Sequence, residues 1–161
     1  MQESGLGEFS ITNKTRMPIP RFRFLDAKND ILGKSYSLSL AFVPESESQK
    51  INKTYRGKDY PTNVLSFSLK KNEGEIIICP AVLKKEVKEK KFDKNFTELL
   101  GFLVIHGMLH LKGMSHSSRI ERERMERAEK KYDKKHFGGN RRGVVHDTSR
   151  SRRVSKRRKK S

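Results

Sequence analysis

The sequence predicts an α+β protein. Three observations support this fold class: an alternating and then apolar stretch at residues 36–43, two β-branched or aromatic runs separated by a turn-like segment, and helical patterns that occupy most of the chain after residue 80. The expected order is one strand, one helix, a pair of strands and then three helices, which is typical of an α+β domain.

The N-terminal half contains the expected strands and one helix. Alternation of apolar and polar residues favours strands, and Ile51 and Tyr55 lie one helical turn apart, as in a short amphipathic helix. Glycine and proline mark the loop that follows. In order, we expect an edge strand around residues 9–11, a strand at 36–43, a helix at 45–55, a loop at 56–63 and a hairpin formed by 64–69 and 75–79.

Three helices are expected in the C-terminal half. Pro80 suits a helix start, where its missing N–H is no loss, and Gly113 is placed to end the second helix. That second helix, at 97–111, is apolar nearly all round, as in a helix buried inside a protein. Ser118 and Glu121 match a capping box at the start of the third. The first helix should extend through about residue 91, and Asn95 followed by Glu98 resembles the start of the second.

The chain has 161 residues, which suits one domain, and a formal net charge of +18. Half of that charge lies in residues 138–161, where ten basic residues accompany one acidic residue. This segment has too few apolar residues to offset the entropy of ordering it. We therefore expect a structured domain at 1–137 and a disordered basic tail at 138–161. Both parts are basic, which predicts a polyanionic partner.

The composition argues against secretion and membrane insertion. The longest apolar run, Leu99 to Ile105, is far shorter than the roughly 20 residues of a membrane span, and no signal sequence is visible. The single cysteine, Cys79, cannot form an internal disulfide, which fits a reducing compartment. We expect a cytoplasmic protein with no disulfide partner and no membrane partner.

Three of the five histidines lie in the segment HGMLHLKGMSH. His106 and His110 are one helical turn apart and project from the same face. Gly113 can take the positive φ that ends the helix, which brings His116 round to complete a three-nitrogen site. Zinc accepts three protein ligands and keeps a fourth position for water in catalytic sites. A lone histidine on an apolar helix is more often a core residue, but three buried without a shared partner would leave polar atoms unpaired.

The histidine spacing matches the zinc-binding skeleton of the metzincin proteases, but one residue argues against a peptidase. That motif has a glutamate general base directly after its first histidine, where this chain has Gly107. The other two histidines, His136 and His146, lie outside the spacing, and we expect both to be solvated. The sequence thus predicts a metal site without the peptidase base.

A second segment, YRGKDYPTNVLSF at residues 55–67, places basic side chains beside a proline turn. Arg56 and Lys58 are candidates for binding a phosphate group and, through it, RNA, although such a loop alone is ordinary. Together with HGMLHLKGMSH, and with GEIIIC at 74–79, it closely resembles the YbeY family of bacterial endoribonucleases. The resemblance spans about Tyr36 to Phe137.

The resemblance implies a zinc-dependent, single-strand-specific endoribonuclease that acts in maturation of the 3′ end of small-subunit (16S) rRNA and in ribosome quality control. It implies one Zn²⁺ per chain at His106, His110 and His116, and a functionally important Arg56. The expected partners are single-stranded RNA, rRNA and the ribosome or its small subunit. The implied fold is a small mixed β-sheet packed against helices, with the metal site at the end of a buried central helix.

The chain departs from the family at one notable position. The family usually has an aromatic residue and an aspartate before its last histidine, and this chain has Met114-Ser115. If that aspartate orients a ligand or takes up a proton, its role is missing here or is filled by another group. Losing an outer-shell partner of this kind can weaken metal binding by roughly 10- to 100-fold.

The sequence leaves open which group attacks the phosphorus and which class of function the protein has. Either water or the RNA 2′-hydroxyl could attack the phosphorus, and Arg56 could meet the developing charge with two parallel hydrogen bonds. The motif offers no general base, which leaves Asp59 and Glu75 as candidates. The alternative functions are a noncatalytic, metal-stabilised ribosome assembly factor and a metal-dependent hydrolase of another substrate. Gly107 argues against a peptide substrate.

Overall fold

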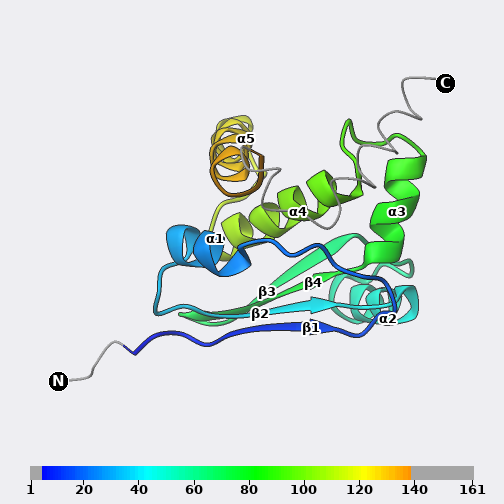
Figure 1. The fold of residues 1–161 in the computed structure, drawn as a ribbon, viewed down its shortest axis with the longest axis horizontal. Coiled ribbons are helices and arrows are strands. Elements are labelled where there is room, and N and C mark those ends of the chain that lie inside the picture. Colours follow the sequence, from blue (N-terminus) through cyan, green and yellow to red (C-terminus); the bar gives the residue numbers. More distant parts are fainter. Residues whose placement is uncertain (1–4, 139–161) are drawn as a thin grey trace.

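A computed structural model describes residues 5–138, in which helices pack around a four-stranded sheet (Figure 1). The elements in chain order are β1 (Phe9–Asn13), α1 (Phe24–Ile31), β2 (Ser37–Phe42), α2 (Glu45–Arg56), β3 (Val64–Lys70), β4 (Glu73–Ile78), α3 (Pro80–Lys88), α4 (Phe96–Leu111), α5 (Arg119–Asp133) and a π-helical turn, η1 (Lys134–Gly138). The basic tail predicted at 138–161 lies outside the described residues except for Gly138, and His146 lies outside them too. No described helix combines the length and apolar character that crossing a membrane requires.

The sheet has the strand order β1-β2-β4-β3 and is mixed. β1 runs parallel to β2 and β2 runs parallel to β4, whereas β3 pairs with β4 in the antiparallel direction. The α+β fold class and the small mixed sheet expected from the sequence are confirmed. β1 and β3 form the two edges, and β3 is the edge strand beneath the central helix α4.

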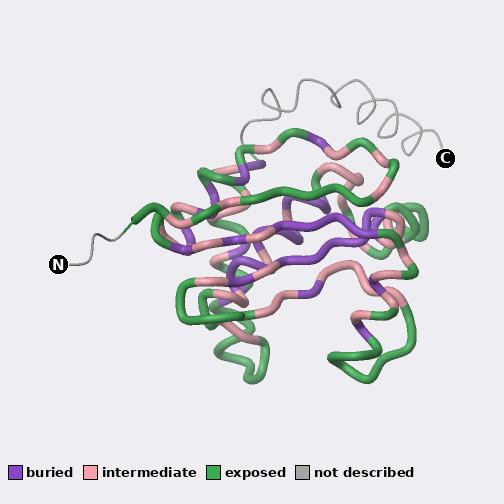
Figure 2. Tube along the Cα trace, turned by 90° about the horizontal axis from the view of Figure 1, so that it is seen from below, coloured by how far each residue is buried: buried purple, intermediate pink, exposed green. Residues whose placement is uncertain are grey.

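Each face of the sheet has its own apolar cluster, because successive strand residues point to opposite faces. Leu40, Ile76 and Ile78 face α1 and α4 in the larger cluster, whereas Ala41 and Ile77 face α2 in the smaller one. Figure 1 shows α1, α4 and α5 on one side of the sheet, and Figure 2 shows that the central strands are buried along most of their length. Each fully buried leucine or isoleucine contributes about 1.5–3 kcal/mol, so the larger cluster fixes α4 against the sheet.

The predicted hairpin is confirmed, but its turn is tighter than the sequence suggested. β3 ends at Lys70 and β4 begins at Glu73, so Gly74 lies inside a strand rather than in the turn. A Cβ at Gly74 would overlap the Tyr36 hydroxyl and lie 2.9 Å from Leu111 Cδ2, closer than real Cβ contacts allow. The glycine is therefore a packing requirement, because the last turn of α4 rests on the strand there.

Helix α1 was not predicted from the sequence. Its apolar residues Phe24, Ala27 and Ile31 are buried at helical spacing, but the helix is only eight residues long and begins without a side-chain cap. A lysine also interrupts its apolar face. Lys28 is buried, its Nζ donates hydrogen bonds to Asn29 Oδ1 and to the Lys34 carbonyl, and burial lowers its pKa.

Two expectations about the C-terminal helices need correction. The Asn95–Glu98 capping box is present, but at α5 only the Ser118 half forms, with the hydroxyl accepting from the Glu121 N–H. His136 is not solvated: its side chain is 10% exposed and its Nε2 lies 2.9 Å from Asp30 Oδ2. Lys135 contacts the same carboxylate at 2.7 Å, so η1 is held to α1.

Candidate metal centre

The last turn of α4 and the bend after it position the three histidines of the motif. His106 and His110 lie on one face of α4, which ends at Leu111. The Met114 N–H then donates to the Leu109 carbonyl and the Gly113 N–H to the His110 carbonyl, the pattern of a Schellman motif. Gly113 has a φ of +104°, which glycine adopts without steric cost. The chain therefore reverses here and returns toward α4, as the sequence predicted.

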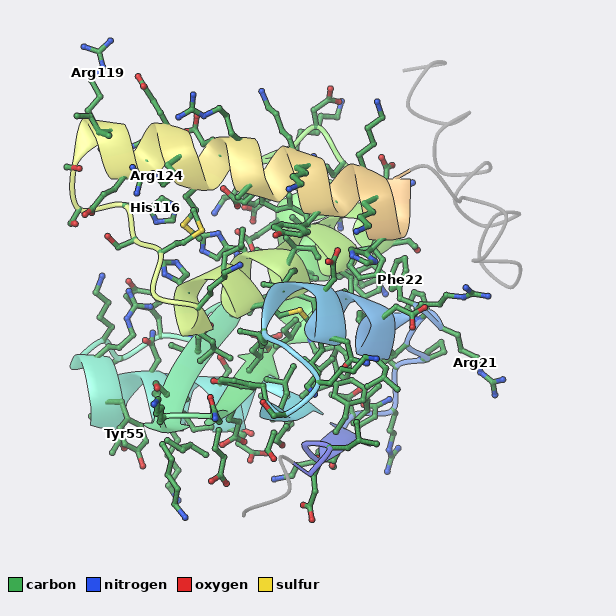
Figure 3. The ribbon with its side chains drawn as sticks, turned by 90° about the vertical axis from the view of Figure 1, so that its left-hand side faces the viewer. Arg21, Phe22, Tyr55, His116, Arg119 and Arg124 are labelled. Atoms are coloured by element: carbon green, nitrogen blue, oxygen red, sulfur yellow. The ribbon has the colours of Figure 1, made fainter. Side chains whose placement is uncertain are left out.

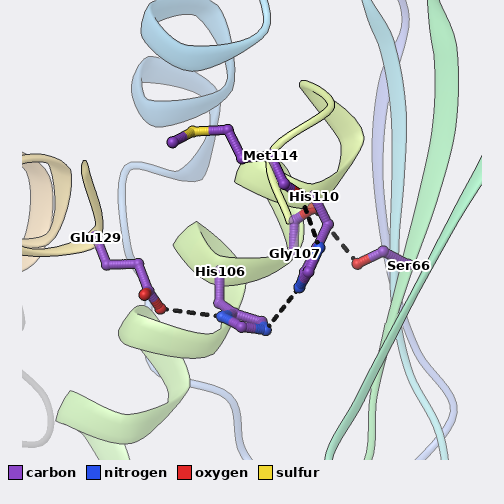
Figure 4. Close-up of polar contacts among 6 residues, drawn as sticks. All are labelled: Ser66, His106, Gly107, His110, Met114 and Glu129. Carbon is purple, nitrogen blue, oxygen red and sulfur yellow. Dashed lines mark hydrogen bonds and ion pairs between the residues drawn. The ribbon is translucent and has the colours of Figure 1, made fainter. Parts of the chain in front are cut away.

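This reversal brings the imidazoles of His106, His110 and His116 together. One ring nitrogen of each lies within 4.8 Å of the others, and the His106 and His110 Nε2 atoms are 3.0 Å apart (Figure 4). The His116 ring stacks on that of His106, with centroids 5.1 Å apart. Among residues 5–138, this triad is the group of histidine, cysteine or acidic side chains that could hold a metal ion.

The hydrogen bonds of His106 Nδ1 and His110 Nδ1 determine whether the Nε2 atoms of the two rings can bind a metal ion. His106 Nδ1 lies 2.9 Å from Glu129 Oε2, and His110 Nδ1 lies 3.1 Å from the Met114 carbonyl oxygen (Figure 4). A carboxylate and a carbonyl only accept hydrogen bonds, so each Nδ1 carries the proton. In the neutral rings both Nε2 atoms then present lone pairs to each other at 3.0 Å. Such an arrangement is favourable when a cation lies between them, and neutral imidazole is the form that binds metals.

Burial favours the neutral form of His110, and the exposure of His116 leaves one side of the histidine centre open to solvent. Burial lowers the pKa of His110, and nearby His106 and His116 lower it further. His106 and His110 are half-buried, whereas His116 is exposed. Figure 3 shows His116 beside the loop that joins α4 to α5. Three imidazoles with an exposed third member leave room for water or a substrate at a bound ion.

Glu129 is a site residue that the sequence analysis missed. It comes from α5, and its side chain is 6% exposed, so a carboxylate is buried against His106. A histidine that ligates a metal commonly donates its other N–H to a carboxylate, which fixes the tautomer and the ring orientation. The available signal was its spacing: Glu129 lies four residues after the buried Met125, on the apolar side of an otherwise charged helix.

Arg56 and Lys58 lie far from the histidine motif in sequence, and among the described residues no hydrogen bond or ion pair joins them to it. Arg56 is the last residue of α2, one residue beyond the predicted helix end, and Gly57 follows with a φ of +70°. Both basic side chains are exposed, and within residues 5–138 neither forms a side-chain hydrogen bond or ion pair. Both are therefore available to bind an anion.

The loop that follows Arg56 is anchored to α2 by buried polar side chains. Asn52 Nδ2 donates to the Tyr60 carbonyl at 2.8 Å. The Ser48 hydroxyl donates to the Thr62 carbonyl and accepts from the Thr62 N–H, both at 2.9 Å. Ser48 and Asn52 are fully buried, so the basic segment is presented from a fixed loop.

The two candidates for the general base, Asp59 and Glu75, lie in different surroundings. Asp59 is already engaged by Gln49 at 3.0 Å and by Lys53 at 3.8 Å. Glu75 pairs with Phe67 in the sheet register, and Phe67 belongs to the apolar cluster on the α2 face. The Glu75 side chain therefore points to the face opposite α4 and its histidines.

The fold and the site together define a class: an α+β protein that carries an open three-histidine centre at the end of a buried helix. The family model described as "Endoribonuclease YbeY" matches residues 13–136. The chain therefore belongs to the YbeY family, as its motifs indicated.

Relatives and a solved structure agree with this assignment. The endoribonuclease YbeY of Francisella philomiragia is 37% identical over 136 residues, 74% of this chain and 85% of that protein. The protein of the same name from Cupriavidus necator is 40% identical over 98 residues, 58% of this chain and 48% of that protein, so the match spans about half of its length. The solution structure of TM1509 from Thermotoga maritima superposes with a TM-score of 0.62 at 27% identity, covering 87% of this chain and 96% of that one.

Proposed function

We propose that this protein is a zinc-dependent, single-strand-specific endoribonuclease of the cytoplasm that matures the 3′ end of small-subunit (16S) rRNA and acts in ribosome quality control. The observation that carries the proposal is the pair of Nε2 atoms on His106 and His110, which face each other at 3.0 Å while their Nδ1 atoms are bound to acceptors. Family membership supports RNA as the substrate, and the relatives named above are called endoribonucleases. The net charge of +18 fits a polyanion.

The donor set suits one zinc ion per chain. His106, His110 and His116 supply three neutral nitrogens and leave a coordination position for substrate or water. A bound zinc ion would supply Lewis acidity toward a phosphoryl oxygen and toward water. Glu129 keeps His106 in the tautomer that presents Nε2, and the Met114 carbonyl does the same for His110.

The basic side chains of Arg56 and Lys58 bind the phosphate groups of the RNA. The unpaired guanidinium of Arg56 can donate two parallel hydrogen bonds to a phosphoryl group whose negative charge grows in the transition state. Lys58 adds a point charge for the RNA backbone. These contacts bind phosphates rather than base edges, which suits single strands of varied sequence.

A single assay tests this function. The full chain, with its metal content measured, is incubated with single-stranded RNA beside His110→Ala and Arg56→Ala. We expect His110→Ala to lose both zinc and cleavage, and Arg56→Ala to keep zinc while its rate falls about 100-fold or more, as for loss of a group that stabilises transition-state charge. Equal trace cleavage by all three proteins would overturn the nuclease and favour a noncatalytic assembly factor. A 2′,3′-cyclic phosphate on the product would assign the attack to the RNA 2′-hydroxyl.

A further inference from the structure

The loop that carries His116 is tied to α5 by one carboxylate. The hydroxyls of Ser115 and Ser117, the two residues that flank His116, both donate hydrogen bonds to Glu121 Oε2. The Ser115 contact is 2.6 Å long, and the two hydroxyl oxygens are 2.9 Å apart. One oxygen atom therefore restrains the chain on both sides of the third histidine.

Glu121 makes these bonds in place of its expected local one. In a full capping box, the glutamate at this position returns to the backbone N–H of the cap residue. Here the Ser118 hydroxyl caps the Glu121 N–H at 3.1 Å, but the carboxylate turns away to Ser115 and Ser117. The hydrogen bonds from these hydroxyls, with the charge of Arg124 adding a smaller effect, lower the pKa of Glu121, so it remains ionised and a strong acceptor.

The position of Glu121 on α5 relates it to the rest of the site. Glu121, Met125 and Glu129 follow one another at four-residue spacing, so they lie along one stripe of the helix. Met125 is fully buried in the core, and Glu129 holds His106 from the far end of the stripe. The same stripe therefore contacts the centre twice, through the His106 ring and through the loop that carries His116.

We propose that Glu121 is a positioning residue that supplies from α5 the carboxylate which the family usually carries at position 115, and that it orients His116 for metal binding through Ser115 and Ser117. This inference rests on the proposed function, because it assumes that the triad binds a metal. Ser115 is then no loss to the site. Its hydroxyl becomes the link to an acid six residues further along the chain.

The test compares zinc affinity of the full chain and its variants by competition with a chromophoric chelator. Glu121→Ala keeps the backbone cap and removes the acceptor, so the dissociation constant should rise about tenfold, the lower end for an outer-shell partner. Glu123→Ala removes the same charge from the same helix, where Glu123 pairs with the exposed Arg119, and should stay within about twofold of wild type. Glu121→Gln retains an oxygen acceptor and should recover most of the affinity.

A double variant tests whether Glu121 takes the place of a carboxylate at position 115. Ser115→Asp combined with Glu121→Ala places a carboxylate at the family position and should return zinc affinity to within about threefold of wild type. The visible absorption of bound Co²⁺ should change in Glu121→Ala and return in the double variant, while all apo proteins keep a similar Tm. A merely structural role would lower the Tm and leave the Co²⁺ spectrum unchanged.

The results distinguish a failure of the Glu121 positioning role from a failure of the proposed zinc-dependent function. Glu121→Ala with the affinity of Glu123→Ala would overturn the role of Glu121, as would a Glu121→Gln variant no better than Glu121→Ala or a double variant without recovery. A wild-type chain that takes up no zinc would instead overturn the proposed function, and the role of Glu121 with it.

Discussion

Glu129 Oε2 lies 2.9 Å from His106 Nδ1, although the two residues are 23 positions apart and belong to different helices. The carboxylate is buried, so the contact joins α4 to α5 at the histidine centre. A buried carboxylate costs free energy unless it is paired, and here its partner is the ring that faces the triad. The packing of α5 on α4 therefore determines the tautomer of a candidate ligand.

We expect Glu129→Gln to weaken zinc binding by about 10- to 100-fold, because the amide oxygen is a weaker acceptor for the His106 N–H than a carboxylate. Competition with a chromophoric chelator measures the zinc affinity of the variant. Glu126→Gln, an exposed change on the same helix, is the matched control and should have no measurable effect. Equal affinities for the two variants would show that the contact does not support the site.

A side chain at Gly107 should destabilise the fold, more so as its size increases. An alanine Cβ would lie 3.0 Å from Ile76 Cδ1 and 3.1 Å from Ser66 Oγ, where α4 crosses the sheet. We expect Gly107→Ala to lower the free energy of unfolding by about 1 kcal/mol, since overpacking of 1–3 kcal/mol outweighs the gain of about 1 kcal/mol in helix propensity. Gly107→Glu should lose far more stability and gain no peptidase activity. Urea titration checks both, and wild-type stability in the glutamate variant would contradict the packing argument.

The contacts of Asp30 with Lys135 and His136 should stabilise the C-terminal turn in a pH-dependent way. Hydrogen bonds from Lys135 and then His136 lower the pKa of Asp30. A carboxyl whose pKa is lower in the folded state contributes stability above its unfolded pKa of about 3.9 and loses it as the pH falls through the folded value.

Asp30→Asn should therefore lower the Tm at pH 7 by a few degrees, for a loss of about 1 kcal/mol. That difference from wild type should persist down to about pH 5 and narrow only below about pH 4. Asp26→Asn, which removes an exposed carboxyl with one 3.8 Å contact to Arg23, is the control. A Tm difference that is unchanged at pH 3 would rule out the ionised carboxyl as the cause.

Binding of single-stranded RNA should weaken steeply with salt, because basic side chains release condensed counterions from the phosphates. For single strands, the slope of log K against log salt should be about −0.7 for each phosphate neutralised. Arg56→Ala removes about one phosphate contact, so it should make the slope less steep by about 0.7. Fluorescence anisotropy with a labelled oligonucleotide measures the slope. An RNA affinity that stays constant between about 50 and about 300 mM salt, a range that includes physiological ionic strength, would show that binding is not electrostatic.

Local chemistry made much of the structure predictable. The capping box at Asn95, the helix stop at Gly113 and the hairpin depend on residues close in sequence, and each is present. The short helix α1 escaped prediction because Lys28 occupies a buried position that its pattern alone marks as polar. His136 was misjudged for a related reason, since its partner Asp30 lies 106 residues away.

The spacing of His106, His110 and His116 was enough to determine a three-nitrogen cluster, because one helical turn and a glycine bend fix their relative positions. Their protonation and support came only from the tertiary structure. Glu129 reaches His106 from α5 across 23 positions, and no local pattern states which ring such a distant carboxylate will meet. The packing of α5 against α4 decides that contact, because a buried carboxylate takes whichever donors the assembled core places beside it. Glu121 lies only four and six residues from its serine partners, but a capping box predicts that it returns to the backbone, and the structure instead turns it toward the loop of His116.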